Sequence, residues 1–253
     1  MKKIQIALQV FSIRDEAERD FEKSMEQVKK MGYAGVELAG LYSNSPEKVR
    51  DCLKSLELEA VSAHIPYEEF MADLPGVVSR YAIIGCSYAA IPYLPEECRY
   101  GGKRFAKVME NIPIIAKECR KAGITLLYHN HDFEFARTKE GDYVLDSMYE
   151  QIPKKDLQTE LDTCWVKKVG EDPVAYIRKY KGRCPVIHVK DFIDIPSFDF
   201  CRLGYGLQDF EGIMNEAEAD GCEWAVVEQD THSRYSSMED AMLSRDYLKT
   251  IGW

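Results

Sequence analysis

The segment ITLLYHNH (residues 124–131) follows a glycine, runs through an apolar stretch and ends in two histidines. A short apolar run of this kind is typical of a strand that is buried on both faces. The pattern of an apolar run closed by charged or histidine side chains returns three more times, as LQTELD (157–162), PVIHVK (185–190) and EWAVVEQ (223–229). These segments predict parallel strands whose carboxyl ends carry polar residues.

Strand segments alternate with helical segments along the whole chain. We predict strands at residues 4–10, 35–38, 59–65, 88–92, 124–130, 157–162, 185–190 and 223–229. We predict helices at residues 15–31, 67–84 (broken by Pro75-Gly76), 101–122, 143–151, 173–180, 209–220 and 238–250, and one more that begins at Ser45-Pro46. Strand–helix alternation indicates a parallel sheet, and eight units in about 250 residues fit one closed (β/α)8 TIM barrel over residues 1–253. An open doubly wound sheet is the alternative, but no glycine-rich phosphate motif follows the first strand.

The composition excludes several classes of protein. The chain has 253 residues and a net charge of −10, with 43 acidic and 33 basic side chains. Nucleic-acid binding needs clustered Lys and Arg, so this charge disfavours a nucleic-acid partner. No stretch approaches the roughly 18 apolar residues of a membrane span, and the first residues lack a signal-peptide cleavage site. We expect a cytoplasmic protein without a membrane partner, whose eight scattered cysteines are free thiols. The possibility of a homo-oligomer stays open.

Polar residues gather where the predicted strands end, and in a parallel barrel the chemistry lies at these carboxyl ends. Four of the five histidines are among them. Any one such residue is more often a loop cap or surface group, so the argument depends on the set. Residues i and i+2 share one face of a strand, which pairs His129 with His131 and His188 with Lys190. The full set is Glu37, His64, His129, His131, Glu134, Glu160, Asp162, His188, Lys190, Glu228 and Asp230.

Four successive strands are followed by Glu134, Asp162, His188 and Glu228. In a closed barrel these side chains converge, and three carboxylates brought together would repel one another and resist ionisation. A divalent cation removes this conflict, because it reduces a charge of −3 to −1. Mixed oxygen and imidazole ligands suit manganese, our first expectation, and also cobalt, magnesium, iron or zinc.

In these strings the chain resembles the xylose isomerase-like TIM barrels, the superfamily of sugar phosphate isomerases and epimerases. The matching strings occur in order along essentially the whole chain: GVEL, SAHIP, YHNHDFEF, ELDTCWV, HVKD and EWAVVEQD. Together they are specific for the superfamily but not for a substrate. The YHNH form resembles a branch that includes inosose dehydratase-like and keto-sugar lyase-like proteins.

The resemblance implies one divalent metal ion held by groups from the fifth to the eighth strands. Asp162, His188 and Glu228 match three of its ligands. The remaining ligand is usually a Glu at the end of the fifth strand, and His129 stands at that position here. We assign the fourth ligand to Glu134, with His129 and His131 as alternatives.

The resemblance further implies a sugar isomerase or epimerase that removes a proton next to the carbonyl of a ketose or related polyol-ketone. The candidate general bases are Glu134, His131 and Glu228, and Lys190 is the candidate for stabilising an oxyanion. Dehydration or β-elimination of a keto-sugar begins with the same enolate and is the alternative reaction. The residues expected to bind a small carbohydrate substrate are Glu37, His64, His129 and Trp165, with further strand-end aromatics at Phe11, Tyr67, Tyr93, Phe133 and Phe192.

Two rival functions use the same fold. An endonuclease IV-like DNA repair enzyme would need a multi-zinc cluster and a basic groove, which five histidines and a charge of −10 disfavour. A non-catalytic sugar-binding barrel would not need Asp162, His188 and Glu228 together.

Overall fold

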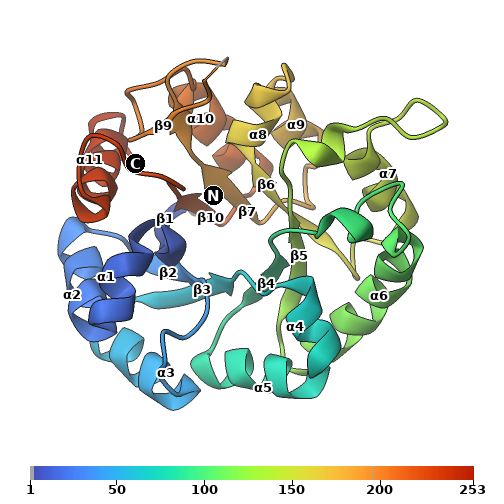
Figure 1. Ribbon diagram of the computed structural model, residues 1–253. Coiled ribbons are helices and arrows are strands. Elements are labelled where there is room, and N and C mark those ends of the chain that lie inside the picture. Colours follow the sequence, from blue (N-terminus) through green and yellow to red (C-terminus); the bar gives the residue numbers. More distant parts are fainter. Residues whose placement is uncertain (1–2, 196) are drawn as a thin grey trace.

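The computed structural model describes residues 3–195 and 197–253, and it is a TIM barrel (Figure 1). The sheet has eight parallel strands in the order β3-β2-β1-β10-β7-β6-β5-β4. A parallel bridge between His64 and Ala90, with Ile65 N donating to Ala90 O at 2.9 Å, joins the two outer strands and completes the ring. The strands are β1 (Gln5–Gln9), β2 (Gly35–Leu38), β3 (Glu59–Ala63), β4 (Tyr88–Ile91), β5 (Thr125–His129), β6 (Gln158–Asp162), β7 (Val186–Val189) and β10 (Trp224–Val227).

Helices surround the strands on the outside of the barrel (Figure 1). They are α1 (Arg14–Arg19), α2 (Phe21–Met31), α3 (Pro46–Ser55), α4 (Tyr67–Ala72), α5 (Leu74–Ile84), α6 (Phe105–Lys121), α7 (Val144–Gln151), α8 (Thr163–Lys168), α9 (Pro173–Lys179), α10 (Phe210–Asp220) and α11 (Ser237–Thr250). Three 3-10 helices lie in the connections: η1 (Val10–Ile13), η2 (Glu96–Cys98) and η3 (Phe133–Phe135). None of the helices in the described ranges is long and apolar enough to cross a membrane.

The eight predicted strands are confirmed, and the predicted helices differ mainly where an aspartate caps a new helix. The helix predicted at residues 15–31 is two helices, because the Asp20 side chain accepts a hydrogen bond from Lys23 N and begins α2. The helix predicted at residues 67–84 breaks at Asp73, which caps α5, rather than at Pro75-Gly76. Pro75 instead occupies the first turn of α5, where its missing N–H costs nothing.

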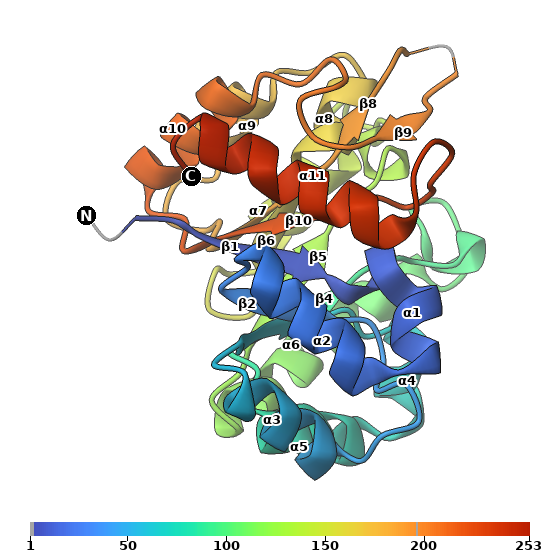
Figure 2. The ribbon, with the colours of Figure 1, turned by 90° about the vertical axis from the view of Figure 1, so that its left-hand side faces the viewer.

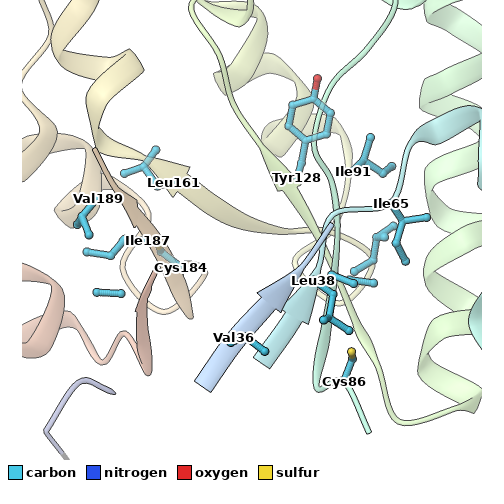
Figure 3. Packing of buried hydrophobic residues seen from close by; sticks show 14 of the residues in the cluster. Val36, Leu38, Ile65, Cys86, Ile91, Tyr128, Leu161, Cys184, Ile187 and Val189 are labelled. Atoms are coloured by element: carbon cyan, nitrogen blue, oxygen red, sulfur yellow. The ribbon is translucent and has the colours of Figure 1, made fainter. Parts of the chain in front are cut away.

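Strand side chains alternate between two cores. Those that face outward pack against the helices in a large apolar cluster, which includes Leu161, Ile187 and Val189 (Figure 3). Those that face inward form a smaller apolar cluster inside the barrel: Ala7, Val61, Tyr88, Ala90, Leu127, Val186, Trp224 and Val226. Two residues further along the same inward faces, the apolar side chains give way to polar ones. The inner cluster therefore forms an apolar base on which the polar end of the barrel rests.

A short hairpin follows β7 at the end of the barrel opposite the N-terminus (Figure 2). Its strands, β8 (Asp191–Phe192) and β9 (Phe200–Cys201), are antiparallel. Phe198, within the hairpin, packs on Trp165 of α8 with ring centroids 5.0 Å apart. The sequence did not predict this hairpin or α8, and both cover the side of the barrel mouth near β6 and β7.

The Asp191 carboxylate organises the segment after β9. Its Oδ1 accepts hydrogen bonds from Phe192 N at 3.0 Å and Gln208 N at 3.2 Å. Its Oδ2 accepts from Gly204 N at 3.0 Å and Gly206 N at 2.9 Å. A Cβ on Gly206 would lie 2.3 Å from Asp191 Oδ1, so this close approach requires glycine. One buried side chain thus replaces regular secondary structure in ordering this loop.

We expect Asp191→Asn to loosen residues 200–208 selectively. An amide has one acceptor oxygen, so two of the four N–H groups lose their partner, at a cost of about 1 kcal/mol each. Hydrogen exchange of the Gly204, Gly206 and Gln208 amides should become about tenfold faster or more, while exchange in β5 stays unchanged. Asp194→Asn is the control, because that carboxylate lies in an exposed turn with Ser197. Equal exchange in wild type and Asp191→Asn would contradict this account.

Candidate metal centre

The strand register brings the polar residues of β5, β6 and β7 together. His129 lies opposite Glu160, and Asp162 lies opposite His188. Glu228 follows β10, whose Val226 also lies opposite His188. These residues are at most 4% exposed. Four strand positions and one loop position therefore point into one small, water-poor volume.

Four residues in this volume can hold one metal ion. His129, Asp162, His188 and Glu228 each offer one ligand atom, and these atoms lie within 4.8 Å of one another. His129 Nε2 is 3.5 Å from Asp162 Oδ2, and His188 Nδ1 is 2.8 Å from Glu228 Oε2. The structure thus brings together Asp162, His188 and Glu228, the three residues on which the predicted metal site depends.

Glu134 is not brought to this quartet. Its Oε1 accepts a hydrogen bond from Tyr128 Oη at 2.5 Å, and its Oε2 accepts from His131 N at 2.8 Å. Tyr128 belongs to the outer apolar cluster, between strands and helices (Figure 3). The Glu134 carboxylate is therefore occupied on the outer side of β5, and His129 takes the fourth position of the quartet. We propose His129 as the ligand in its place.

A second polar layer lies beneath the quartet. His188 Nε2 contacts Glu37 Oε2 at 2.6 Å and also Glu160 Oε1. His64 Nε2 lies 3.0 Å from the same Glu160 oxygen, and Gln9 Nε2 donates to Glu37 Oε2 at 2.8 Å. A second group of potential ligand atoms also lies within 4.8 Å of one another, and it comes from His64, His129, Glu160 and His188. A metal-bound histidine commonly donates its other ring N–H to a carboxylate, and Glu37 and Glu160 are placed to accept it from His188.

Several buried polar atoms of these residues lack a hydrogen-bond partner, as expected where a divalent cation binds. Among the described residues, His129 Nδ1 and Glu160 Oε2 are buried and make no hydrogen bond, and the buried Asp162 Oδ2 is met by an ion pair with Lys190 but by no hydrogen bond. Burial lowers the pKa of His129 to about 4, so its imidazole is neutral and keeps a lone pair for a metal. Oxygen and imidazole donors together suit a first-row divalent ion.

Lys190 supplies positive charge at the same place. Its Nζ lies 2.8 Å from Glu228 Oε2, 3.2 Å from Asp162 Oδ2 and 3.2 Å from Asp230 Oδ1. Burial acts to lower the pKa of Lys190, but the three carboxylates outweigh it and raise this pKa well above its usual value. Lys190 is therefore a fixed ammonium. The layer is still negative, since five carboxylates face one lysine: Glu37, Glu160, Asp162, Glu228 and Asp230.

A pocket of about 480 Å³ opens above the quartet, within the range of small-molecule sites. Among the residues expected to act on substrate, His64, His129, His131, Lys190 and Glu228 line it. Glu37 is fully buried in the lower layer and Trp165 packs behind His131, with ring centroids 5.1 Å apart, so neither is among its lining residues. Tyr67 and Phe192 are also buried, whereas Phe11 and Tyr93 line the pocket.

Sequence reasoning gave no role to three residues that the structure places in the site. Glu160 and Asp230 belong to the predicted set of strand-end residues, and alternation along a strand puts Glu160 on the same face as Asp162. Gln9, two residues after the inward-facing Ala7, carries the same signal but is not in that set. No role for these residues follows from the sequence, because one sequence does not show how deep in the barrel a strand residue lies.

Comparison with known proteins shows the family of this barrel. Residues 25–251 match the family described as "Xylose isomerase-like TIM barrel". The chain belongs to this family. An inosose dehydratase from Clostridium tetani is 21% identical over 271 residues, which cover 92% of this chain and 90% of that protein. The relationship spans nearly the full length of both proteins.

Solved structures show the same fold at low sequence identity. A sugar phosphate isomerase/epimerase from Parabacteroides distasonis superposes with a TM-score of 0.84 at 23% identity, covering 97% of this chain and 98% of that one. A probable 3-DHS dehydratase from Bacillus anthracis superposes with a TM-score of 0.77 at 13% identity, covering 97% and 99%. Isomerases and dehydratases are thus both found among proteins with this fold.

In this xylose isomerase-like barrel, we expect His129→Ala to weaken binding of Mn²⁺ by at least a hundredfold, because one ligand of four is lost. Glu134→Gln should bind Mn²⁺ as the wild type does, since Glu134 lies on the outer side of β5. Isothermal titration calorimetry of metal-free protein measures both, and circular dichroism checks the fold. Weak binding by Glu134→Gln together with unchanged binding by His129→Ala would reverse the assignment.

Glu134 should also make stability depend on pH. Burial raises its pKa to about 7, whereas the unfolded chain has an ordinary value near 4.5. The folded state therefore holds a proton that the unfolded state releases, so the free energy of unfolding falls as pH rises from about 4.5 to 7. The loss approaches ~3 kcal/mol at pH 8.

Glu134→Gln should remove this component, because the amide cannot ionise and can still bond Tyr128 Oη and His131 N. Urea unfolding of metal-free protein at pH 5 and pH 8 tests this. The variant should be more stable than the wild type at pH 8 and similar to it at pH 5. A parallel pH dependence in both proteins would show that Glu134 ionises freely.

Proposed function

We propose that the protein is a metal-dependent enzyme that removes a proton next to the carbonyl of an uncharged sugar-like ketone and then expels water or an alcohol by β-elimination. The observation that carries the proposal is the arrangement of neutral His131 and the Lys190 ammonium around one pocket above the candidate metal quartet. The names of the inosose dehydratase relatives support the same reaction class.

His131 is the proposed base. It lines the pocket, its Nδ1 makes no hydrogen bond among the described residues, and burial holds its pKa well below the usual value. The neutral ring takes the proton from the α-carbon, the C–H electrons form the double bond of the enolate, and the carbonyl π electrons move to the oxygen. A lone pair of this oxygen then re-forms the carbonyl, and the electrons of the enolate double bond become a new double bond between the α- and β-carbons. The β-oxygen leaves with the electrons of its bond to carbon and takes up the proton from the imidazolium. His131 is thereby returned to its neutral form.

The enolate oxygen needs positive charge that is already in place. The Lys190 ammonium lines the pocket, and its fixed positive charge can stabilise this oxygen electrostatically. Asp162, His188, Glu228 and His129 would hold a divalent ion, which when bound supplies Lewis-acid stabilisation worth several kcal/mol. His64, at the edge of the lower layer, lines the pocket and is placed to bond a substrate hydroxyl.

Epimerisation is the second candidate, because the same enolate can be reprotonated instead of losing a group. The fold-level likeness to a protein named sugar phosphate isomerase/epimerase keeps it open. The two outcomes are distinguished by incubating metal-loaded protein with ketoses, inososes and keto-glycosides in D2O and recording NMR spectra. Elimination gives an unsaturated product and releases water or alcohol, while epimerisation gives deuterium at a carbon that keeps its hydroxyl.

We expect His131→Ala to lower turnover by a factor of about 10²–10⁴ while its metal content stays at the wild-type level, because a lost general base has this effect. His232→Ala is the matched control, since this histidine pairs with Asp240 and does not line the pocket. Normal turnover by His131→Ala would remove His131 from the mechanism.

Two results would favour the rival functions. Cleavage of abasic DNA by the wild-type protein would support an endonuclease IV-like enzyme. The absence of any bound divalent ion would support a non-catalytic barrel.

A further inference from the structure

The pocket has two walls of opposite character, and each comes from one half of the barrel. The polar wall is built at the ends of β5, β7 and β10 by His129, His131, Lys190, Glu228 and Asp230. The other wall is built after β1 to β4, mostly from apolar residues: Phe11, Ala39, Gly40, Pro66, Pro92 and Tyr93. The proposed chemistry uses the polar wall alone, so the apolar wall has no role in it.

Two aromatic rings of this apolar wall are held open to the pocket. Phe11 is 39% exposed and Tyr93 is 48% exposed. The Arg14 guanidinium lies 4.2 Å from the Phe11 ring centroid and donates to Phe11 O at 2.9 Å. Exposed rings that are fixed in this way are typical of binding sites, because little conformational entropy is lost when a ligand covers them.

Tyr93 is fixed from a different direction. The Arg99 guanidinium lies 4.8 Å from its ring centroid and donates to Leu94 O at 2.8 Å. The rings of His131 and Phe133 each lie edge-on to Tyr93, with centroids 5.5 Å away. The contact with His131 joins the apolar wall to the proposed base. A ligand group that packs on Tyr93 therefore lies beside the base that is proposed to remove the proton.

The charges that line the pocket disfavour a phosphorylated ligand. Of the described residues that line it, Lys190 is the only Lys or Arg, and its ammonium already contacts three carboxylates. Glu69, Glu228 and Asp230 also face the pocket. A phosphate dianion would meet these carboxylates with no Lys or Arg among the described lining residues free to offset the repulsion.

We propose that the substrate is an uncharged glycoside: a keto-sugar ring on the polar wall, joined to an apolar, preferably aromatic, group that packs on Phe11 and Tyr93. This inference rests on the proposed function, because it places the reacting ketone at His131. The inference adds the apolar group to which the keto-sugar ring is joined. Ring-on-ring packing there selects aryl over alkyl glycosides, because aromatic pairs gain more than the area they bury.

The test measures binding without turnover. Metal-loaded protein is titrated by calorimetry with both anomers of methyl and phenyl D-glucopyranoside, which lack the reactive ketone, and with glucose 6-phosphate. For the better anomer, the phenyl glucoside should bind about tenfold more tightly than the methyl glucoside. Glucose 6-phosphate should bind more weakly than either. The Phe11→Ala/Tyr93→Ala double variant should bring the phenyl-to-methyl ratio close to one.

Tyr205→Ala is the matched control, because Tyr205 is 46% exposed and is not among the residues that line this pocket. It should keep the tenfold ratio. Equal binding of phenyl and methyl glucosides, no binding of any glucoside, tighter binding of glucose 6-phosphate, or an unchanged ratio in the double variant would overturn the inference. Failure of the proposed function has a different signature: the aryl preference persists, yet no keto-sugar reacts in D2O.

Discussion

The burial of several carboxylates at one end of the barrel is the constraint on which the rest of the site depends. A buried carboxylate without a partner is costly, and the described part of this chain places four buried carboxylates and the half-buried Asp230 around one small volume. Lys190 contacts three of them and the imidazoles of His64 and His188 contact the others. This arrangement remains deficient in positive charge, which is the physical reason to expect a divalent cation at the quartet.

The fold supports this costly layer from below and from outside. Leu127, Val186 and Val226 fill the barrel beneath it, and they lie two residues before His129, His188 and Glu228 on the same strand faces. The outer cluster meanwhile anchors the alternate residues of each strand to the helices. Because most strands are held on both faces, the polar side chains at their ends have little freedom to separate. Stability is thus concentrated in the apolar half, and charge in the half that faces the pocket.

Much of this could be predicted from sequence, because a strand that is apolar on both faces leaves a clear signal. The strand ends located Asp162, His188 and Glu228, and alternation along the strand fixed their faces. Glu134 could not be placed in this way. It follows β5 through a turn and η3, where alternation no longer applies, and the hydroxyl of outward-facing Tyr128 decides its direction.

The depth of each residue in the barrel was the other limit. Glu37 lies near the end of its strand, as Asp162 does, but the register pairs it with Gln9 and leaves it beneath His188, out of reach of the pocket. Depth depends on the stagger between neighbouring strands, which a single sequence does not record. The β8–β9 hairpin was missed for a simpler reason. Two-residue strands have no periodicity, and one carboxylate, Asp191, orders the loop.

The division of the pocket into two walls explains how one barrel can keep its chemistry while its substrate changes. The groups that move protons and bind charge come from β5, β6, β7 and β10, whose strand register fixes them. The apolar wall comes from loops after β1 to β4, whose length and composition do not affect that register. Substitutions in these loops can therefore alter which molecule is held without disturbing the charged layer. In this chain the Tyr93–His131 contact is the point where the two walls meet, so a ligand that fills the apolar wall also orders the ring that is proposed to act as base.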